Sequence, residues 1–414
     1  MDGIDFLIIV LRALGAFALW LGGTAVLIWG ERRVVAKMQS RVGPNRLGPF
    51  GLLQTIADGA KLFFKEDISP SGIDKVVYIA APITSAVVAL VTFAVIPYGG
   101  TFTVAGREVT LQVWDPEIGL LWVLAMGSIG VYGIVLAGWS SGSKYPLLGG
   151  VRSSAQLISY ELAMSLAVAA VFVFHGSLRA SDIVEAQAQP FFGSLPLPSW
   201  NVLPMLPAFV LFLMAAVAET QRPPFDLPEA EGELVAGFHT EYSGAKFAMF
   251  FLAEFMNVIT MSAMTVTLFF GGPGGPLFGP ALLQAVLPVV YFILKTCVFI
   301  FVFIWLRATL PRLRYDRLMD LGWRVMLPLG LLWVLLTGFS VVLRQSTDRN
   351  TVLRYAAVAA VAGALLYLLA PLVSRLPGRG PGGGGGGGPD DGEPLPAGDG
   401  GRALPERRGE KVGV

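Results

Sequence analysis

Long apolar segments recur along this sequence, and they restrict its fold more than any other feature. A helix needs about 20 apolar residues to cross a bilayer core of about 30 Å. Segments of this kind occur at residues 5–30, 76–98, 118–139, 155–174, 202–218, 248–271, 282–306, 325–343 and 352–373. The fifth is the weakest, because it is short and contains proline. We predict an all-α polytopic membrane protein of about nine transmembrane helices.

Composition excludes several classes of protein. Apolar residues make up 54% of the chain and charged residues 14%, whereas roughly a quarter of the residues in a soluble domain are charged. The formal net charge of +1 provides no broad basic field, so nucleic acid is not expected as a partner. With one cysteine and two histidines, the chain cannot build an iron–sulfur, zinc or bis-histidine haem site alone. We expect any redox cofactor to belong to other chains.

Basic residues are distributed unequally between the two sides of the predicted helices. The loops 31–75, 140–154, 219–247 and 307–324, together with the C-terminal tail, carry 23 Lys and Arg residues, against 5 on the other side when Arg354 at the start of the last segment is included. Because basic loops stay in the cytoplasm, we predict that the N-terminus lies outside and that these loops and the tail are cytoplasmic. Residues 1–374 form the predicted membrane domain. The Gly- and Pro-rich residues 375–414 are predicted to be a disordered tail.

Among the ionisable residues within or at the ends of the apolar segments, the ones to explain are Glu161, Glu219, Glu254 and Lys295. An ionisable group at bilayer depth costs a few kcal/mol on insertion scales, roughly 2.5–3.5 kcal/mol, and usually has a function. The alternative is that each group pairs with a neighbour and only fixes helix packing. The presence of four such groups beside an acidic loop favours a hydrophilic path.

The adjoining loop, residues 219–246, is acidic and rich in proline. Pro223 and Pro224 should end the fifth helix, and Pro228 suits the first turn of a new one. Glu229 and Glu233 would share a face of that helix, where repulsion and desolvation raise carboxyl pKa values. We predict a cluster that can hold protons, with a solvated acidic loop as the alternative. Its six acids are Glu219, Asp226, Glu229, Glu231, Glu233 and Glu241.

The other cytoplasmic segments also carry patterns. Gly and Pro residues at 43–49 form an elbow, and residues 50–66 have one apolar face, which predicts a helix lying in the membrane interface. Its alternative role is a simple anchor. The segment 140–161 combines Lys144 and Arg152 with small residues that permit close helix approach. The basic segment 307–320 favours a cytoplasmic location.

Four motifs resemble one family closely: GPNRLGPFGLLQTIADGAKLFFKE, KYPLLGGVRSSAQLISYE, AETQRPPFDLPEAEGELVAGFHTEY and LRATLPRLRYDRLM. They are similar to the H subunit of bacterial NADH:quinone oxidoreductase, respiratory complex I. The resemblance covers roughly residues 15–328. It implies an eight-helix core in the bacterial cytoplasmic membrane, to which some members add a C-terminal helix.

The resemblance also implies a function. A member of this family carries no cofactor, forms the membrane side of a quinone chamber and couples quinone reduction to proton translocation. Its partners are peripheral subunits that close the chamber, one with the terminal iron–sulfur cluster, and antiporter-like and small membrane-arm subunits. NADH, FMN and the iron–sulfur clusters lie on partner subunits, so this chain would be a non-redox subunit of an NADH dehydrogenase.

Site residues follow from the same resemblance. Those expected at the quinone chamber or at partner contacts are Glu31, Arg32, Arg41, Arg46, Asp58, Lys61, Glu66, Lys144, Arg152, Arg222 and Arg307. Those expected on the proton pathway are Glu161, Glu219, Asp226, Glu229, Glu231, Glu233, Glu241, Glu254 and Lys295. Two alternatives remain: the membrane anchor of a related energy-converting hydrogenase, and a stand-alone ion transporter. No internal repeat is evident, which argues against the transporter.

Overall fold

The fold is a bundle of helices with one short hairpin in the described part of the chain. The computed structural model describes residues 3–104, 107–189, 199–226 and 235–345. The α-helices are α1 (Gly3–Met38), α2 (Gln54–Phe64), α3 (Lys75–Thr92), α4 (Gly119–Ser140), α5 (Lys144–His175), α6 (Ala180–Ala188), α7 (Leu206–Glu219), α9 (Gly244–Phe269), α10 (Ala281–Thr309), α11 (Tyr315–Asp320) and α12 (Leu327–Gln345). Short 3-10 helices occupy Pro49–Gly51, Phe93–Val95 and Gly237–His239, and a π-helix occupies Leu321–Met326.

The helices match the predicted apolar segments. Seven are long and apolar enough to cross a membrane, and α7, with 14 residues, is a shorter apolar helix where the weakest segment was predicted. This confirms an all-α polytopic membrane protein. The ninth predicted span, 352–373, and the predicted tail, 375–414, lie outside the described residues.

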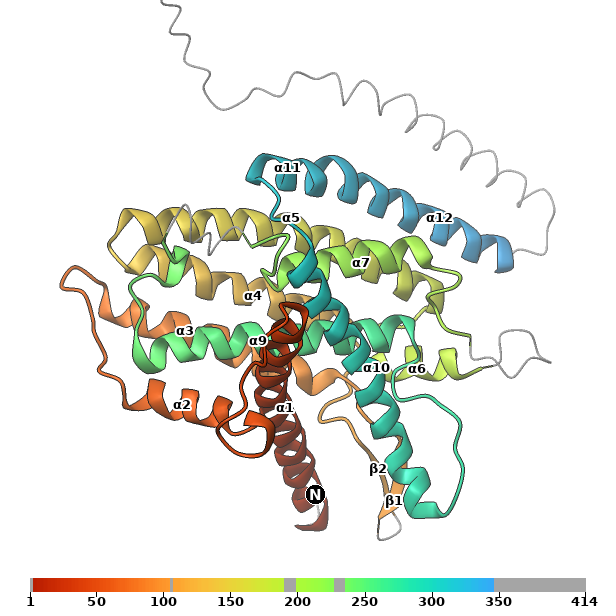
Figure 1. The fold of residues 1–414 in the computed structure, drawn as a ribbon. Coiled ribbons are helices and arrows are strands. Elements are labelled where there is room, and N and C mark those ends of the chain that lie inside the picture. Colours follow the sequence, from red (N-terminus) through yellow and green to blue (C-terminus); the bar gives the residue numbers. More distant parts are fainter. Residues whose placement is uncertain (1–2, 105–106, 190–198, 227–234, 346–414) are drawn as a thin grey trace, which may run out of the picture. The chain divides into compact units, whose positions relative to one another are not determined.

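The helices pack in an order that brings distant segments together. α4 contacts both α3 and α5, α5 also contacts α7 and α12, and α9 contacts α3, α1 and α10. Figure 1 shows α3, α4, α5 and α9 running side by side, while α1 and α10 cross them at a steeper angle. The buried core consequently includes residues from α1, α4, α5, α7, α9 and α10.

Glycines allow α4 and α5 to approach closely. A Cβ added at Gly138 of α4 would lie 2.6 Å from the carbonyl oxygen of Pro146 and 3.2 Å from Cα of Gly150, both on α5. Real Cβ atoms do not come this close to a backbone oxygen. The predicted close helix contact of segment 140–161 is therefore confirmed.

A helix is present at the predicted position, α2, preceded by a turn, and its location in the membrane interface stays a prediction. Gly51 has a positive φ of 77°, and a Cβ there would lie 2.5 Å from the Pro44 backbone, so the elbow requires glycine at this position. On α2 the side chains of Ile56, Phe63 and Phe64 are exposed, Phe64 by 92%. Thr55 donates a hydrogen bond to the Ala25 carbonyl, which fixes α2 against α1.

The opposite end of the bundle contains two elements that the sequence did not predict. β1 (Thr101–Val104) and β2 (Arg107–Thr110) pair antiparallel, with Thr101 opposite Thr110. Helix α6 carries the buried Gln187, whose amide donates to the Thr267 carbonyl and whose Oε1 accepts from the backbone N–H groups of Asn201 and Gly271. These contacts fasten the end of α9 to α6.

Candidate functional site

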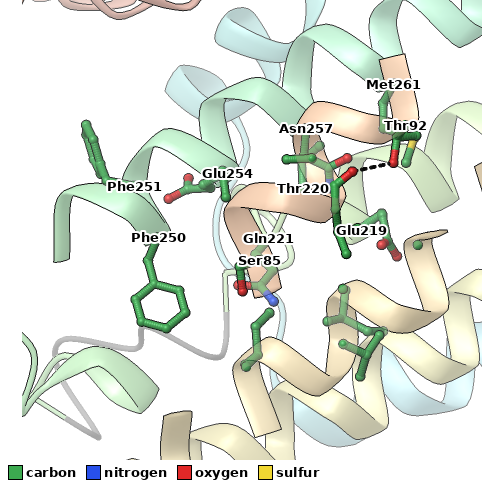
Figure 2. Close-up of a pocket in the computed structure, with 18 of the residues that line it drawn as sticks. Ser85, Thr92, Glu219, Thr220, Gln221, Phe250, Phe251, Glu254, Asn257 and Met261 are labelled. Atoms are coloured by element: carbon green, nitrogen blue, oxygen red, sulfur yellow. Dashed lines mark hydrogen bonds between the residues drawn. The ribbon is translucent and has the colours of Figure 1, made fainter. Parts of the chain in front are cut away.

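A cavity of about 340 Å³, lined by both polar and apolar side chains, lies among α3, α4, α5, α7 and α9. Figure 2 shows Glu219, Glu254 and Asn257 among the labelled residues of its wall, together with Phe250 and Phe251. At about 30 Å³ per water molecule in the liquid, such a volume accommodates roughly ten waters. The cavity therefore has room for water molecules between apolar helices.

Two carboxylates meet beside this cavity. The side chains of Glu161 on α5 and Glu219 at the end of α7 are buried, each with 8% residual exposure. Both point to α4: the Cβ position of Gly127 is 3.5 Å from Glu161 Oε1 and 4.0 Å from Glu219 Oε1. Ser128 of α4 donates a hydrogen bond to Glu161 Oε1. Glu219 Oε2 is buried and has no hydrogen-bond partner among the described residues.

Helix α5 positions this pair and its surroundings through three residues of the QLISYE motif. Gln156 donates to the carbonyls of Ala218 (3.1 Å) and Phe225 (2.8 Å), which holds the end of α7. The Tyr160 hydroxyl donates to the Leu318 carbonyl of α11 at 3.0 Å. Glu161 follows directly and faces α4. One helix thus fixes α7, α11 and the carboxylate together.

A network of two acids and two arginines lies where α1, α9, α10 and the turn after α7 meet. Arg222, with 4% exposure, places Nη1 at 3.0 Å and 3.2 Å from the two carboxylate oxygens of Glu31 and Nε at 2.9 Å from Glu254 Oε1. Arg307 also donates to Glu31. The guanidinium of Arg222 lies 4.4 Å from the Phe255 ring centre. The formal charges balance, as a buried ionic network requires.

The turn after α7 places Arg222 in this network. Helix α7 ends at Glu219, and Gln221 adopts a left-handed conformation with φ 51°. Its side chain donates to Ser153 Oγ at 2.7 Å, which holds the turn against α5. Because Glu254 and Arg307 also line the cavity, the cavity connects the ionic network with Glu219.

The first-loop residues form a separate group at α2. Arg32 pairs with Asp58, and Lys61 lies 3.9 Å from the same carboxylate. Burial raises the pKa of Asp58, but hydrogen bonds from Arg32 and Gln54 outweigh it, and the pKa lies below its usual value. Arg41 donates a hydrogen bond to the side chain of Gln39 at 2.8 Å, within the turn that follows α1.

The remaining predicted chamber residues do not enter either cluster through contacts that the structure describes. Arg152 of α5 lies 5.9 Å from the ring centre of Tyr315. Lys144 begins α5, and Arg46 and Glu66 lie in the segments before and after α2. Their roles at a chamber or a partner surface stay predictions.

The acidic loop is described only at its two ends. Asp226 pairs with Arg312 at 3.3 Å, and the backbone carbonyl of Glu241 accepts a hydrogen bond from Tyr78. The helix predicted to begin at Pro228 lies outside the described residues, as do Glu229, Glu231 and Glu233. The predicted proton-holding cluster of this loop stays a prediction.

Lys295 lies apart from the carboxylates. Its ammonium group donates to the carbonyls of Phe270 (2.8 Å), Gly272 (3.0 Å) and Gly274 (2.7 Å), beyond the end of α9. An ammonium has three donors and no acceptor, so these bonds use all of them. The geometry suits a cap on the negative end of α9, and a role in proton transfer stays a prediction.

Replacing Lys295 separates these two roles. We expect Lys295→Met to lower the stability of the α9–α10 connection by roughly 1–3 kcal/mol, because hydrogen bonds to charged groups contribute on that order. The effect is measured by heating the purified protein and recording the temperature at which the assembled protein is lost. If Lys295→Met translocates as many protons per electron as wild type, Lys295 has a structural role. A lower number of protons per electron at unchanged stability would contradict the structural role.

Several residues of the site were not predicted. Ser128 and Gly127 are small residues of an apolar helix, where such residues commonly serve helix packing. His239 lines the cavity, and burial lowers its pKa to about 4, so it is neutral at physiological pH. In the described part of the chain, no group of three or more His, Cys, Asp and Glu residues could hold a metal ion.

The fold and the cavity together define a multi-pass membrane protein with buried ionisable groups in its interior. Comparison with protein families matches residues 11–338 to the family described as NADH dehydrogenase. The chain is 51% identical over 348 residues to the NADH-quinone oxidoreductase H subunit of Frankia alni, and 52% identical over 348 residues to that of Frankia casuarinae. Each match covers 84% of this chain and 75% of the relative. The chain belongs to the NADH dehydrogenase family, alongside these H subunits.

Proposed function

We propose that this chain is a membrane subunit of an NADH-quinone oxidoreductase and couples quinone reduction to proton translocation. The names of its relatives support the complex. The observation that carries the coupling role is the cavity that connects a buried ionic network with a buried carboxylate pair. In this proposal the N-terminus lies outside and the basic loops face the cytoplasm.

The reaction supplies a change of charge. Reduction of a quinone to a quinol takes up two electrons and two protons, and the electrons come from NADH through FMN and iron–sulfur clusters on partner subunits. The side of this chain that carries Arg32, Asp58 and the Glu31–Arg222 pair would form the membrane side of the quinone chamber. Peripheral subunits would close it above.

The ionic network would transmit this change. Arg222 contacts both Glu31 and Glu254, so a charge that appears near α1 alters the strength of both ion pairs. Glu254 lines the cavity, so the change reaches the cavity wall. Buried charges interact strongly because the surrounding dielectric is low. The proton occupancy of Glu219 and Glu161 would shift in response, and protons would pass toward antiporter-like and small membrane-arm subunits. The coupling is an interaction free energy between two sites.

Removing either carboxyl tests the proposal. In membranes that contain the whole complex, we expect Glu161→Gln and Glu219→Gln to assemble normally and to lose quinone reductase activity and proton translocation at least tenfold. Glutamine keeps the size of the side chain but cannot carry the proton. Glu185→Gln, which changes an exposed glutamate of α6, is the matched control and should behave as wild type. Full activity with intact proton translocation in both cavity variants would refute the coupling role.

A further inference from the structure

Helix α4 has no side chain at Gly127, and this leaves a gap next to the carboxylates of Glu161 and Glu219. Around the Cβ position of Gly127, the only heavy atoms that the structure describes within 4 Å, apart from the glycine's chain neighbours and nearby helix backbone, are Glu161 Oε1 and Glu219 Oε1. Gly127 has an ordinary helical conformation, so its backbone does not require glycine. The absence of a side chain therefore leaves the space of about one methyl group, bordered by the two carboxylate oxygens.

The next residue of α4 orients one of these carboxylates. Ser128 Oγ donates to Glu161 Oε1 and also lies 3.3 Å from the Leu124 carbonyl one turn earlier. The bond orients the Glu161 carboxyl group with Oε1 toward Gly127. The Glu219 carboxyl group places Oε1 at the same position, and its buried Oε2 has no hydrogen-bond partner among the described residues.

We propose that Gly127 and Ser128 are positioning residues that form a seat for one water molecule, through which Glu161 and Glu219 exchange a proton. A buried water needs two to four polar partners, and the carboxylate oxygens supply them. This inference rests on the proposed function, because it assumes that Glu161 and Glu219 carry protons.

The transfer conserves atoms and charge. The O–H bond of the Glu161 carboxylic acid breaks as its proton joins the water oxygen, and one hydrogen of that water forms a new O–H bond on the Glu219 carboxylate. The water is regenerated, Glu161 becomes the carboxylate, and Glu219 becomes the acid. The reverse transfer uses the same atoms.

The first test fills the gap. In Gly127→Ala the added methyl would lie 3.5 Å and 4.0 Å from the two oxygens, at ordinary van der Waals contact, so the helix should fold while water is displaced. Gly130→Ala is the matched control on the same helix: Gly130 also lines the cavity, but its methyl would meet only Val88 Cγ1, at 3.4 Å, and neither carboxylate.

Both variants are compared in membranes that contain the whole complex. We expect Gly127→Ala to assemble as wild type and to lose quinone-linked proton translocation at least fivefold, while Gly130→Ala keeps it. Equal rates in the two variants would overturn the role of the gap.

The second test removes the hydroxyl and restores it. We expect Ser128→Ala to slow proton translocation several-fold and to shift the carboxyl C=O band of Glu161 in the redox-induced infrared difference spectrum. Ser128→Thr should restore both, since Ser128 is exposed on its outer side and leaves room for a methyl group. An unchanged band and rate in Ser128→Ala, or no recovery in Ser128→Thr, would overturn the role of Ser128.

The glutamine variants separate this inference from the proposed function. Loss of activity in Glu161→Gln and Glu219→Gln with wild-type rates in Gly127→Ala and Ser128→Ala rejects only the seat. Wild-type activity in the glutamine variants rejects the proposed function itself.

Discussion

Arg222→Met abolishes assembly of the active complex or lowers its quinone reductase activity by more than tenfold. This substitution removes the one guanidinium that contacts both Glu31 and Glu254. Two carboxylates then share a buried region, and of the cations that the structure describes in contact with them only Arg307, beside Glu31, remains. Removing one partner of a buried ion pair typically costs about 3–5 kcal/mol, because the remaining charge stays desolvated.

The measurement compares assembled complex on native gels with quinone reductase activity per assembled complex. Arg324→Met is the control, because Arg324 forms an exposed pair with Asp320, and such pairs contribute roughly 0.3–0.5 kcal/mol. Arg222→Lys should recover little, since a lysine is a point charge and cannot bridge two carboxylates with separate nitrogens. Normal assembly and activity in Arg222→Met would contradict the role of the network.

Gly138→Val disrupts the contact between α4 and α5 and removes most of the assembled complex. Even the Cβ atom would lie 2.6 Å from the Pro146 carbonyl oxygen, and valine adds two methyl groups to it. The atoms in the way, the Pro146 carbonyl oxygen and Cα of Gly150, belong to the backbone of α5. The two helices must therefore move apart, and Ser128 then loses its contact with Glu161. We expect assembled complex below roughly one tenth of the wild-type amount, since overpacked cores cost about 1–3 kcal/mol or more.

Quantification of the assembled complex in solubilised membranes checks this result. Gly22→Val on α1 is the control, because a Cβ at that position meets no described heavy atom within 4 Å. Comparable amounts of complex in the two variants would show that the α4–α5 contact tolerates expansion.

The sequence predicted the helical elements well because membrane helices leave a simple signal. Eight of the nine apolar segments coincide with described helices, and helix α2 was recognisable from the apolar face that includes Ile56 and Phe63. The hairpin was missed because its strands have four residues each, too few for a clear alternating pattern. Helix α6 has only nine residues and was missed for a similar reason.

The sequence indicated which ionisable residues belong to the candidate site. It did not indicate which of them contact each other. Glu161, Glu219 and Glu254 were conspicuous because carboxylates are rare in apolar segments. The pairing of Arg222 with Glu31 joins positions 191 residues apart, and no local pattern reveals it. Gly127 became noticeable only when the carboxylate oxygens beside it were located.

The shortness of α7 has a consequence for the backbone that follows it. Its 14 residues span about 21 Å at 1.5 Å per residue, less than a hydrocarbon core of about 30 Å. The irregular chain from Thr220 to Asp226 continues beyond it, and polar backbone at that depth is tolerated where protein shields it or water reaches it. Here α5, α1 and α9 provide the shielding through Gln156, Glu31 and Glu254. Where α7 stops, side chains of neighbouring helices consequently take over the role that regular backbone hydrogen bonds have along the rest of the helix.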